Sequence, residues 1–240
     1  MRWRTTTGLK SRSLRRRLRQ SPRRGEVKIL VTAGPTREFI DPVRFLSNPS
    51  SGRMGFSIAR IASMMGHDVT LVAGPVSLKT PKGVRRVDVI SARDMLAAVE
   101  KEHFDCMIAT AAVADWRPVE CASQKLKKEA MDGMLRLVRN PDVIKTVSAK
   151  VRSLRGKDSR RILVGFAAET GDPTTEASRK CREKGLDLVV ANDVTAAGCG
   201  FGVKTNRVSL VWPDGRIEAL PMMSKDSVAR RIVRAVEKLA

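Results

Sequence analysis

The chain has 240 residues, which fits one α/β domain with a small appendage, and its hydrophobic content of 42% can bury a sizeable core. It has no run of 18 apolar residues, which excludes a transmembrane helix, and its arginine-rich start lacks the apolar stretch of a signal peptide. The formal net charge of +21 suits anionic ligands such as nucleotides and phosphorylated metabolites, and would also suit nucleic acid.

The segment 1–26 differs from the rest of the chain in its charge. Residues 1–25 hold ten basic residues and no acidic one, and the remainder stays basic without them. Such a run of like charges is typical of a disordered extension. We interpret it as a solvated tail or a start codon placed too early, and a basic arm for RNA or a membrane surface stays the alternative.

From residue 27 onward, expected strands alternate with expected helices. Strands are expected at 27–32, 68–73, 84–90, 106–112, 162–167 and 186–191. Helices are expected at 52–65, at 92–103, from Pro141 to about 151, and at 174–184. This alternation predicts a Rossmann-like α/β three-layer sandwich over residues 27–240: a mostly parallel sheet with helices on both faces, plus a small antiparallel hairpin extension.

Turn residues predict two antiparallel hairpins in the second half. Asp132-Gly133 separates 125–128 from 134–138, and Pro213-Asp214-Gly215 separates 207–212 from 216–220. Ser224 is then expected to cap a terminal helix. The apolar stripe of that helix is Val228, Ile232, Val233, Val236 and Leu239.

The cysteine and histidine pattern indicates neither a zinc site nor a redox dithiol. The four cysteines form no Cys-x-x-Cys pair, and we expect reduced, mostly buried thiols in a cytoplasmic protein. His67 and His103 have no ligand-spaced partner and are expected at the surface or at element boundaries. Because the chain has no tyrosine, an enzyme built from it would work with Lys, Arg, Asn, Asp and bound metal.

In an open α/β sheet, ligands bind beyond the carboxyl ends of the strands, where the strand order reverses. The first such loop, residues 33–55, is far longer than the usual turn of about 2–6 residues. It ends in Ser50-Ser51-Gly52 at an expected helix N-terminus, where free N–H groups make a phosphate site. Gly52 and Gly55 would allow close approach of an oxyanion, although glycines that serve turn geometry alone stay an alternative.

Further loops follow the ends of later strands. Asp115 is either a cap or turn residue, or a partner for a ligand or metal. The lysines at 125, 127 and 128 either blunt an edge strand or present a cation to a nucleotide phosphate. Three more segments could bind ligand or serve as caps and turns: Asn140-Pro141-Asp142, residues 165–170 and Ala191-Asn192-Asp193.

Short motifs run through residues 27–240 in a fixed order. They are Thr32-Ala-Gly-Pro-Thr-Arg-Glu38, Asp41-Pro-Val-Arg-Phe-Leu-Ser-Asn48, Ser50-Ser-Gly-Arg-Met-Gly55, Ala111-Ala-Val-Ala-Asp115, Lys125-Leu-Lys-Lys128, Asn140-Pro-Asp142, Gly165-Phe-Ala-Ala-Glu-Thr170, Ala191-Asn-Asp193 and Gly200-Phe-Gly202 with Asn206. As an ordered set they resemble phosphopantothenoylcysteine synthetase, the ligase domain of the bifunctional phosphopantothenoylcysteine decarboxylase/phosphopantothenate–cysteine ligase family.

The resemblance implies a two-step ligation in coenzyme A biosynthesis. CTP, in the bacterial type, activates the carboxylate of 4′-phosphopantothenate as an acyl-cytidylate and releases pyrophosphate. The amine of L-cysteine then attacks the acyl carbon, and CMP leaves. Neither step needs an enzyme nucleophile, so catalysis would come from positioning and electrostatics. Mg²⁺ or another divalent cation would bridge the phosphates with few protein ligands, so the sequence leaves its site unknown.

The resemblance also assigns roles to residues. Lys125 is expected to offset charge on the α-phosphate, and Asn48 to polarise the acyl-cytidylate carbonyl. Arg44 is expected to bind the substrate phosphate across a dimer interface. Ala111, Ala112 and Asp115 are expected to contact substrate, and Asp115 and Lys125 also the nucleotide. The remaining nucleotide-binding candidates are Gly34, Ser51, Gly52, Pro141, Asp142, Val143, Ile144, Phe166, Lys180 and Lys184, although a solvated helix face would also explain the last two.

Three departures qualify the resemblance. The flavin-dependent decarboxylase half does not accompany these motifs, so we expect no flavin, and a separate decarboxylase could be a partner. Pro49 stands where many relatives have histidine, and residues 202–206 replace a more acidic or serine-bearing version. A homodimer is expected only because the family implies one.

Two other classes of function stay open. An NAD(P)-binding Rossmann oxidoreductase would explain the sheet and the first loop, but the chain lacks G-x-G-x-x-G and any Tyr-x-x-x-Lys pair. A nucleic-acid-binding protein would explain the charge, but only 4% of the residues are aromatic, which leaves few stacking platforms.

Overall fold

The computed structural model describes residues 26–128, 133–154, 161–169, 173–193, 198–199 and 202–240. All of the predicted basic extension except Glu26 lies outside the described residues, as does Asp132 of the first predicted hairpin turn. No helix in the described ranges combines the length and the apolar character needed to cross a membrane.

Eight strands form one central sheet. They are β1 (Lys28–Ala33), β4 (Asp68–Ala73), β5 (Val84–Asp88), β6 (Cys106–Ala109), β9 (Ile162–Glu169), β10 (Leu188–Asp193), β12 (Val208–Val211) and β13 (Ile217–Ala219). Their order is β13-β12-β10-β9-β6-β1-β4-β5. The six strands from β10 to β5 pair in parallel, β12 pairs antiparallel with β10, and β13 pairs antiparallel with β12. The chain fills one side of β1 with β4 and β5 before it returns to the other side with β6, so the strand order reverses between β1 and β6.

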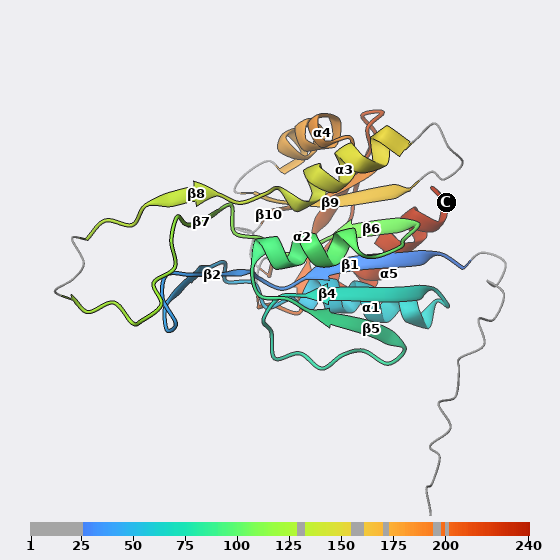
Figure 1. The fold of residues 1–240 in the computed structure, drawn as a ribbon. Helices are drawn as coiled ribbons and strands as arrows, with labels where there is room; N and C mark the ends of the chain where they lie inside the picture. Colours follow the sequence, from blue (N-terminus) through green and yellow to red (C-terminus); the bar gives the residue numbers. More distant parts are fainter. Residues whose placement is uncertain (1–25, 129–132, 155–160, 170–172, 194–197, 200–201) are drawn as a thin grey trace, which may run out of the picture.

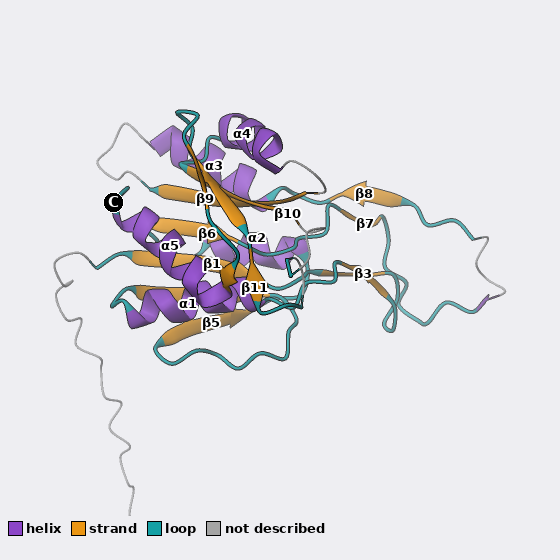
Figure 2. Ribbon diagram, turned by 180° about the vertical axis from the view of Figure 1, so that it is seen from behind, coloured by secondary structure: helices purple, strands orange, loops and turns teal. Residues whose placement is uncertain are grey.

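Within the described ranges, five helices cover the two faces of this sheet. They are α1 (Arg53–Met64), α2 (Ala92–Glu100), α3 (Val143–Leu154), α4 (Pro173–Lys184) and α5 (Lys225–Glu237). Helices α2, α3 and α4 lie on the face turned toward the viewer in Figure 1, and α1 and α5 lie on the opposite face, seen in Figure 2. The predicted three-layer α/β sandwich is therefore confirmed.

The strands separate two apolar cores because their side chains alternate between the faces. In β1, Ile29 and Val31 pack into the core under α1 and α5, whereas Leu30 packs into the core under α2, α3 and α4. The helices complete these cores with stripes at helical spacing, such as Val143, Val147 and Val151 of α3. The predicted stripe of α5 is buried up to Val236, and the side chain of Ser224 accepts a hydrogen bond from the Ser227 N–H, which confirms the predicted cap.

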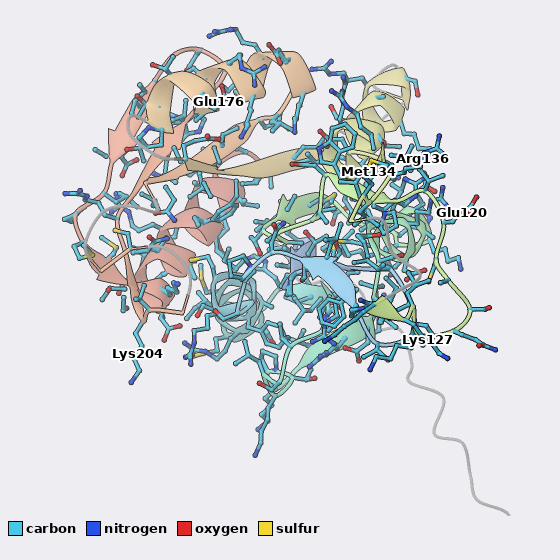
Figure 3. All side chains as sticks on the ribbon, turned by 90° about the vertical axis from the view of Figure 1, so that its left-hand side faces the viewer. Glu120, Lys127, Met134, Arg136, Glu176 and Lys204 are labelled. Carbon is cyan, nitrogen blue, oxygen red and sulfur yellow. The ribbon has the colours of Figure 1, made fainter. Side chains whose placement is uncertain are left out.

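A projecting arm extends from the carboxyl ends of the parallel strands, at the left of Figure 1. It contains the hairpin of β2 (Arg37–Phe39) and β3 (Phe45–Ser47), and the ladder of β7 (Trp116–Pro118) and β8 (Leu137–Arg139). The described residues 119–128 and 133–136 form its outer part. In Figure 3 the arm points toward the viewer, with Glu120, Lys127, Met134 and Arg136 on one side of the molecule and Glu176 and Lys204 on the other.

The pairing predicted for the arm is wrong in one strand. Residues 125–127 form no strand, and Leu137–Arg139 pairs with Trp116–Pro118 instead. The Arg139 guanidinium stacks on Trp116, 5.3 Å from the ring centre, and supports this longer-range ladder. The N–H and C=O groups of Leu126 bond to Asp41 and Arg44 rather than to a neighbouring strand. The second predicted hairpin, β12–β13, is confirmed.

Both histidines lie at element boundaries, as expected. His67 directly precedes β4 and is buried there, where its Nδ1 accepts from the Val27 N–H at 3.3 Å and its Nε2 lies 3.1 Å from Glu237, and His103 lies between α2 and β6 and is exposed. Two smaller points differ from the expectation. Pro141 precedes α3 instead of lying in its first turn. The β2–β3 hairpin was not predicted, nor was the short pair of β11 (Thr205–Asn206) and β14 (Met223–Ser224).

Candidate functional site

A cavity of about 410 Å³ opens at the carboxyl ends of β1, β6 and β9, at the point where the strand order reverses. This is where an open α/β sheet binds its ligands. Eleven of the sixteen predicted site residues line it. They are Asn48, Ala111, Ala112, Asp115, Pro141, Asp142, Val143, Ile144, Phe166, Lys180 and Lys184.

One wall of the cavity is the start of α3. The Asp142 carboxylate accepts a hydrogen bond from the Lys145 N–H at 3.0 Å and so caps the helix. Val143 is buried beneath this wall, while Ile144 faces Phe166 and Gly165 across the cavity. A Cβ atom on Gly165 would lie 2.7 Å from Leu186 and 3.6 Å from Ile144. Gly165 is therefore packed closely against Leu186, and the side chains of Ile144 and Phe166 supply the apolar lining at this wall.

Two lysines of α4 supply the positive charge of the cavity. Lys184 Nζ lies 2.7 Å from the Asp142 carboxylate, and Lys180 Nζ lies 2.6 Å from Glu169. About a quarter of each lysine side chain is exposed, so the two do not form a solvated helix face. A ligand phosphate that entered here would exchange places with a carboxylate of the protein, with little change in the net charge around each lysine.

The opposite wall is the loop that follows β6. The N–H of Ala111 donates to the Thr32 hydroxyl and that of Ala112 donates to the Gly34 carbonyl, so both amides are used within the chain. The Asn48 side-chain amide donates to the carbonyls of Ala112 and Val113 at 3.2 and 3.1 Å. This wall thus offers methyl groups and carbonyl oxygens, and Asn48 is held at its edge.

The mouth of the cavity lies beside Asp115. Its side chain is exposed there, and its backbone carbonyl accepts from the Asn140 N–H at 2.8 Å. Asn140 also donates from its amide to the Ala114 carbonyl, which ties the loop after β6 to the residues before α3. The carboxylate is therefore presented at the entrance by a loop that is fixed on both sides.

A smaller cavity of about 140 Å³ adjoins the first at the N-terminus of α1. Ser51 and Gly52 line it, and it shares Ala111, Ala112, Phe166 and Ala168 with the larger cavity. Among the described residues no side chain caps α1, because Gly52 occupies the cap position with a φ of 74°. Gly34 does not line the cavity but lies under it: a Cβ on Gly52 would come within 3.4 Å of Gly34. The uncapped N–H groups make this end suited to an anion.

Three buried residues of this smaller cavity were given no role among the predicted site residues. Asn192, Asn206 and Lys225 all line it and are at most 9% exposed. The Oδ1 atom of Asn192 has no hydrogen-bond partner among the described residues. Burial and the nearby Arg53 lower the pKa of Lys225. Asn192 lies at the carboxyl end of β10, in a segment that the sequence analysis named as a possible ligand contact, whereas no sequence pattern indicated that Lys225 faces a cavity.

Two predicted residues, Arg44 and Lys125, lie on the arm and line neither cavity. Arg44 bonds through Nε and Nη2 to the carboxylate of Asp41. Burial alone would raise the pKa of Asp41, but hydrogen bonds from Arg44 and from three backbone N–H groups hold that pKa well below its ordinary value. Lys125 is exposed. A single copy of the described chain does not bring these two cations to its own cavity.

The acidic, cysteine and histidine side chains of the described ranges form no group of three that could hold a metal ion. The four cysteines are unpaired, and all except Cys121 are buried, as predicted. Burial raises the pKa of Cys181 to about 11, which keeps it a thiol.

Comparison with known proteins places these features in a family. The model of the DNA/pantothenate metabolism flavoprotein C-terminal domain matches residues 25–239. The coenzyme A biosynthesis bifunctional protein CoaBC of Vibrio parahaemolyticus is 46% identical over 215 residues, 88% of this chain and 52% of that protein. CoaBC of Bacillus subtilis is 44% identical and is covered over 51% of its length. The chain thus spans about half the length of the curated relatives it matches.

Solved structures agree with this assignment. A crystal structure of the C-terminal domain of CoaBC superposes with a TM-score of 0.71 at 40% identity, over 88% of this chain and 94% of that one. The DNA/pantothenate metabolism flavoprotein of Streptococcus pneumoniae shares the fold, with a TM-score of 0.74 at 21% identity, over 89% of this chain and all of that one. With the model match over residues 25–239, the chain belongs to the DNA/pantothenate metabolism flavoprotein C-terminal domain family.

Proposed function

We propose that the protein is a phosphopantothenate–cysteine ligase of coenzyme A biosynthesis that uses CTP. The observation that carries this proposal is the pair of adjoining cavities, which offer two places for phosphate, at the lysines of α4 and at the N-terminus of α1, with Asn48 beside the larger one. Relatives named for coenzyme A biosynthesis, 43–46% identical over this domain, support the substrate class.

In the first step, a carboxylate oxygen of 4′-phosphopantothenate attacks the α-phosphorus of CTP. An acyl-cytidylate forms and pyrophosphate leaves with the β- and γ-phosphates. The cytosine would lie in the apolar part of the larger cavity beside Ile144 and Phe166, next to Pro141 and Val143. Lys180 and Lys184 would lie toward the phosphates. Lys125 would offset the charge that grows on the α-phosphate, the kind of electrostatic stabilisation that often dominates such reactions.

In the second step, the amine of L-cysteine attacks the acyl carbon, the amide forms, and CMP leaves with the bonding electrons. Asn48 would donate a hydrogen bond to the acyl oxygen. Its amide already bonds to Ala112 and Val113, so it would exchange one of these carbonyls for the substrate oxygen. The protein supplies orientation and charge and forms no covalent intermediate.

A divalent cation such as Mg²⁺ fits this scheme as a companion of the nucleotide. Mg²⁺ commonly binds substrate phosphates with only one or two carboxylates of the protein. Asp115, an exposed carboxylate that lines the larger cavity, would be one such ligand. The chemistry of the cation would be to neutralise the departing pyrophosphate.

The proposed active form is a homodimer joined through the arm. Eight of the twelve exposed large apolar side chains in the described ranges lie on the arm. They are Val43, Phe45, Trp116, Val119, Met134, Leu135, Leu137 and Val138. Such clustering marks an interaction surface rather than scattered surface residues. Because Arg44 and Lys125 lie on the same arm, a second copy would bring both cations to a cavity that they do not reach in their own chain.

The test of the function is pyrophosphate release from the purified protein with Mg²⁺, 4′-phosphopantothenate and L-cysteine. We expect release that requires phosphopantothenate and proceeds faster with CTP than with ATP. A preference for ATP would keep the ligase and change the nucleotide. Folded, dimeric protein that releases no pyrophosphate with either nucleotide would refute the proposed function.

A further inference from the structure

The buried carboxylate of Asp41 connects two segments that are far apart in the sequence. Its Oδ1 accepts hydrogen bonds from the N–H groups of Val43 and Arg44, both at 2.8 Å, within the turn between β2 and β3. Its Oδ2 accepts from the Arg44 guanidinium and from the Leu126 N–H at 3.2 Å. The first oxygen therefore shapes the local turn, and the second reaches across the arm.

Arg44 completes the connection from the other side. Its Nη2 lies 2.6 Å from Asp41 Oδ2 and also donates to the Leu126 carbonyl at 2.9 Å. Both backbone polar groups of Leu126 are thus bound by one ion pair. A third bond, from the Ala122 N–H to the Ile40 carbonyl at 2.9 Å, attaches the same segment three residues before Lys125.

The buried carboxylate of Asp41 is well suited to hold residues 122–126 in one position. The side chain of Asp41 is fully buried, and an ionised buried carboxylate is stable only while its hydrogen bonds are made. Hydrogen bonds to an ionised group are shorter and stronger than neutral ones. Movement of Leu126 would remove one hydrogen bond from this buried charge, which costs free energy. The segment next to Lys125 is therefore held in its position.

We propose that Asp41 is a positioning residue for Lys125, which acts by clamping the backbone of Leu126 together with Arg44. The proposal deepens the proposed function, because it assumes that Lys125 serves the activation step. Asp41 itself lines neither cavity and touches no substrate in this scheme. Its contribution is to fix the backbone from which the Lys125 side chain extends. This restricts the positions that the ammonium group can reach.

The variant Asp41→Asn separates the two roles of the carboxylate. The amide oxygen can still accept from Val43 and Arg44 and keep the turn, but the amide nitrogen cannot accept from Leu126 or from the guanidinium. We expect pyrophosphate release to slow about tenfold, with an unchanged KM for L-cysteine. Asp214→Asn is the matched control, because Asp214 also accepts from a backbone N–H two residues later, in the distant β12–β13 turn. It should keep the wild-type rate.

A double-mutant cycle tests whether Asp41 acts through Lys125. In a Lys125→Gln background, Asp41→Asn should change the remaining rate by less than about twofold. An equal loss in both backgrounds, or a single variant as active as Asp214→Asn, would overturn the proposal while leaving the ligase function intact. If Asp41→Asn does not fold, Asp41→Glu keeps the charge but displaces the second oxygen, and the same cycle applies.

Hydrogen exchange tests the clamp without any reaction. Amides of residues 122–128 should exchange about tenfold faster in Asp41→Asn than in the wild type or in Asp214→Asn, because the protecting bond to Leu126 is lost. Unchanged exchange in this segment would overturn the clamp even if the enzyme is active. A protein that lacks ligase activity but shows the faster exchange would refute the proposed function and the role of Asp41 in it, and leave only the structural link.

Discussion

Gly55 lies where α1 approaches the sheet most closely, and Gly55→Ala tests that approach. A Cβ atom there would lie 2.4 Å from the Thr110 hydroxyl oxygen and 2.5 Å from the Ala33 methyl carbon. Neither neighbour can move away cheaply. The Thr110 hydroxyl donates to the Thr32 carbonyl at 2.6 Å, and Ala33 is fixed in β1 with no exposed surface. The helix must therefore move instead.

The size of that movement follows from the distances. Ordinary contact for a Cβ begins near 3.4 Å, so α1 must retreat by about 1 Å. Overpacking of this kind costs about 1–3 kcal/mol, and the better helix propensity of alanine offsets up to about 1 kcal/mol of that. We expect a net loss of about 1–2 kcal/mol, which lowers the melting temperature by about 2–8 °C for a domain of this size.

The same movement would carry Ser51 and Gly52, which line the smaller cavity, away from its other wall. A displacement of about 1 Å can reduce a rate by about 100-fold when it misplaces reacting groups. Calorimetry and pyrophosphate release should both change, with the rate falling about 10- to 100-fold. Ser57→Ala, which adds no atom on the same helix, is the control. A Gly55→Ala variant with wild-type melting and rate would refute the close approach of α1 to the sheet.

Three further predictions concern charge. Lys125→Gln should slow pyrophosphate release by about 100-fold or more while leaving a measurable residual rate, whereas Asn48→Asp should slow mainly the consumption of the acyl-cytidylate. Single-turnover kinetics with wild-type rates for both variants would contradict the assigned roles. Lys184→Gln should raise the KM for CTP about tenfold. Arg182 is an exposed cation on the same helix, so Arg182→Gln should leave this KM unchanged. Equal effects of the two variants would mean that only the net charge of the protein matters. Because its folded pKa is depressed, Asp41 stabilises the fold above its unfolded pKa of about 3.9, and this contribution is lost as the pH falls through the folded pKa. The melting difference between wild type and Asp41→Asn should therefore be constant from about pH 5 to 7 and shrink below about pH 4, and a difference that grows on acidification would contradict the sign.

Local patterns in the sequence predicted the layers of the fold but not the arm. The mostly apolar run at 68–73 identifies a strand that is buried on both faces, and the period-3.6 run at 225–237 identifies a helix that is buried on one face. The partner of Leu137–Arg139 could not be predicted in this way, because Trp116–Pro118 is eighteen residues distant and held by stacking on Arg139. The β2–β3 hairpin did leave a signal, since Asp41-Pro42 is a turn dipeptide between two apolar pairs.

The site was predictable where it follows strand ends. Asn48 and Asp115 come from the segments that follow β1 and β6, Phe166 lies in the carboxyl-terminal half of β9, and the structure brings all three to one cavity. Lys225 could not be found in this way, because it comes from the start of α5 and reaches the cavity through tertiary packing. The sequence also could not predict that Lys125 lies away from the cavity, because the order of motifs along the chain does not give the distances between them in the fold.

The ion pairs of Lys180 and Lys184 mean that an anionic ligand must compete with two carboxylates of the protein to bind in the larger cavity. Each lysine already has a carboxylate within the same chain, at an effective concentration that a dilute anion in solution does not reach. A ligand with several negative charges can displace Glu169 and Asp142 together, whereas one with few charges gains little by doing so. The cavity would therefore favour a triphosphate over its monophosphate product, and the two carboxylates would return to their lysines as that product leaves.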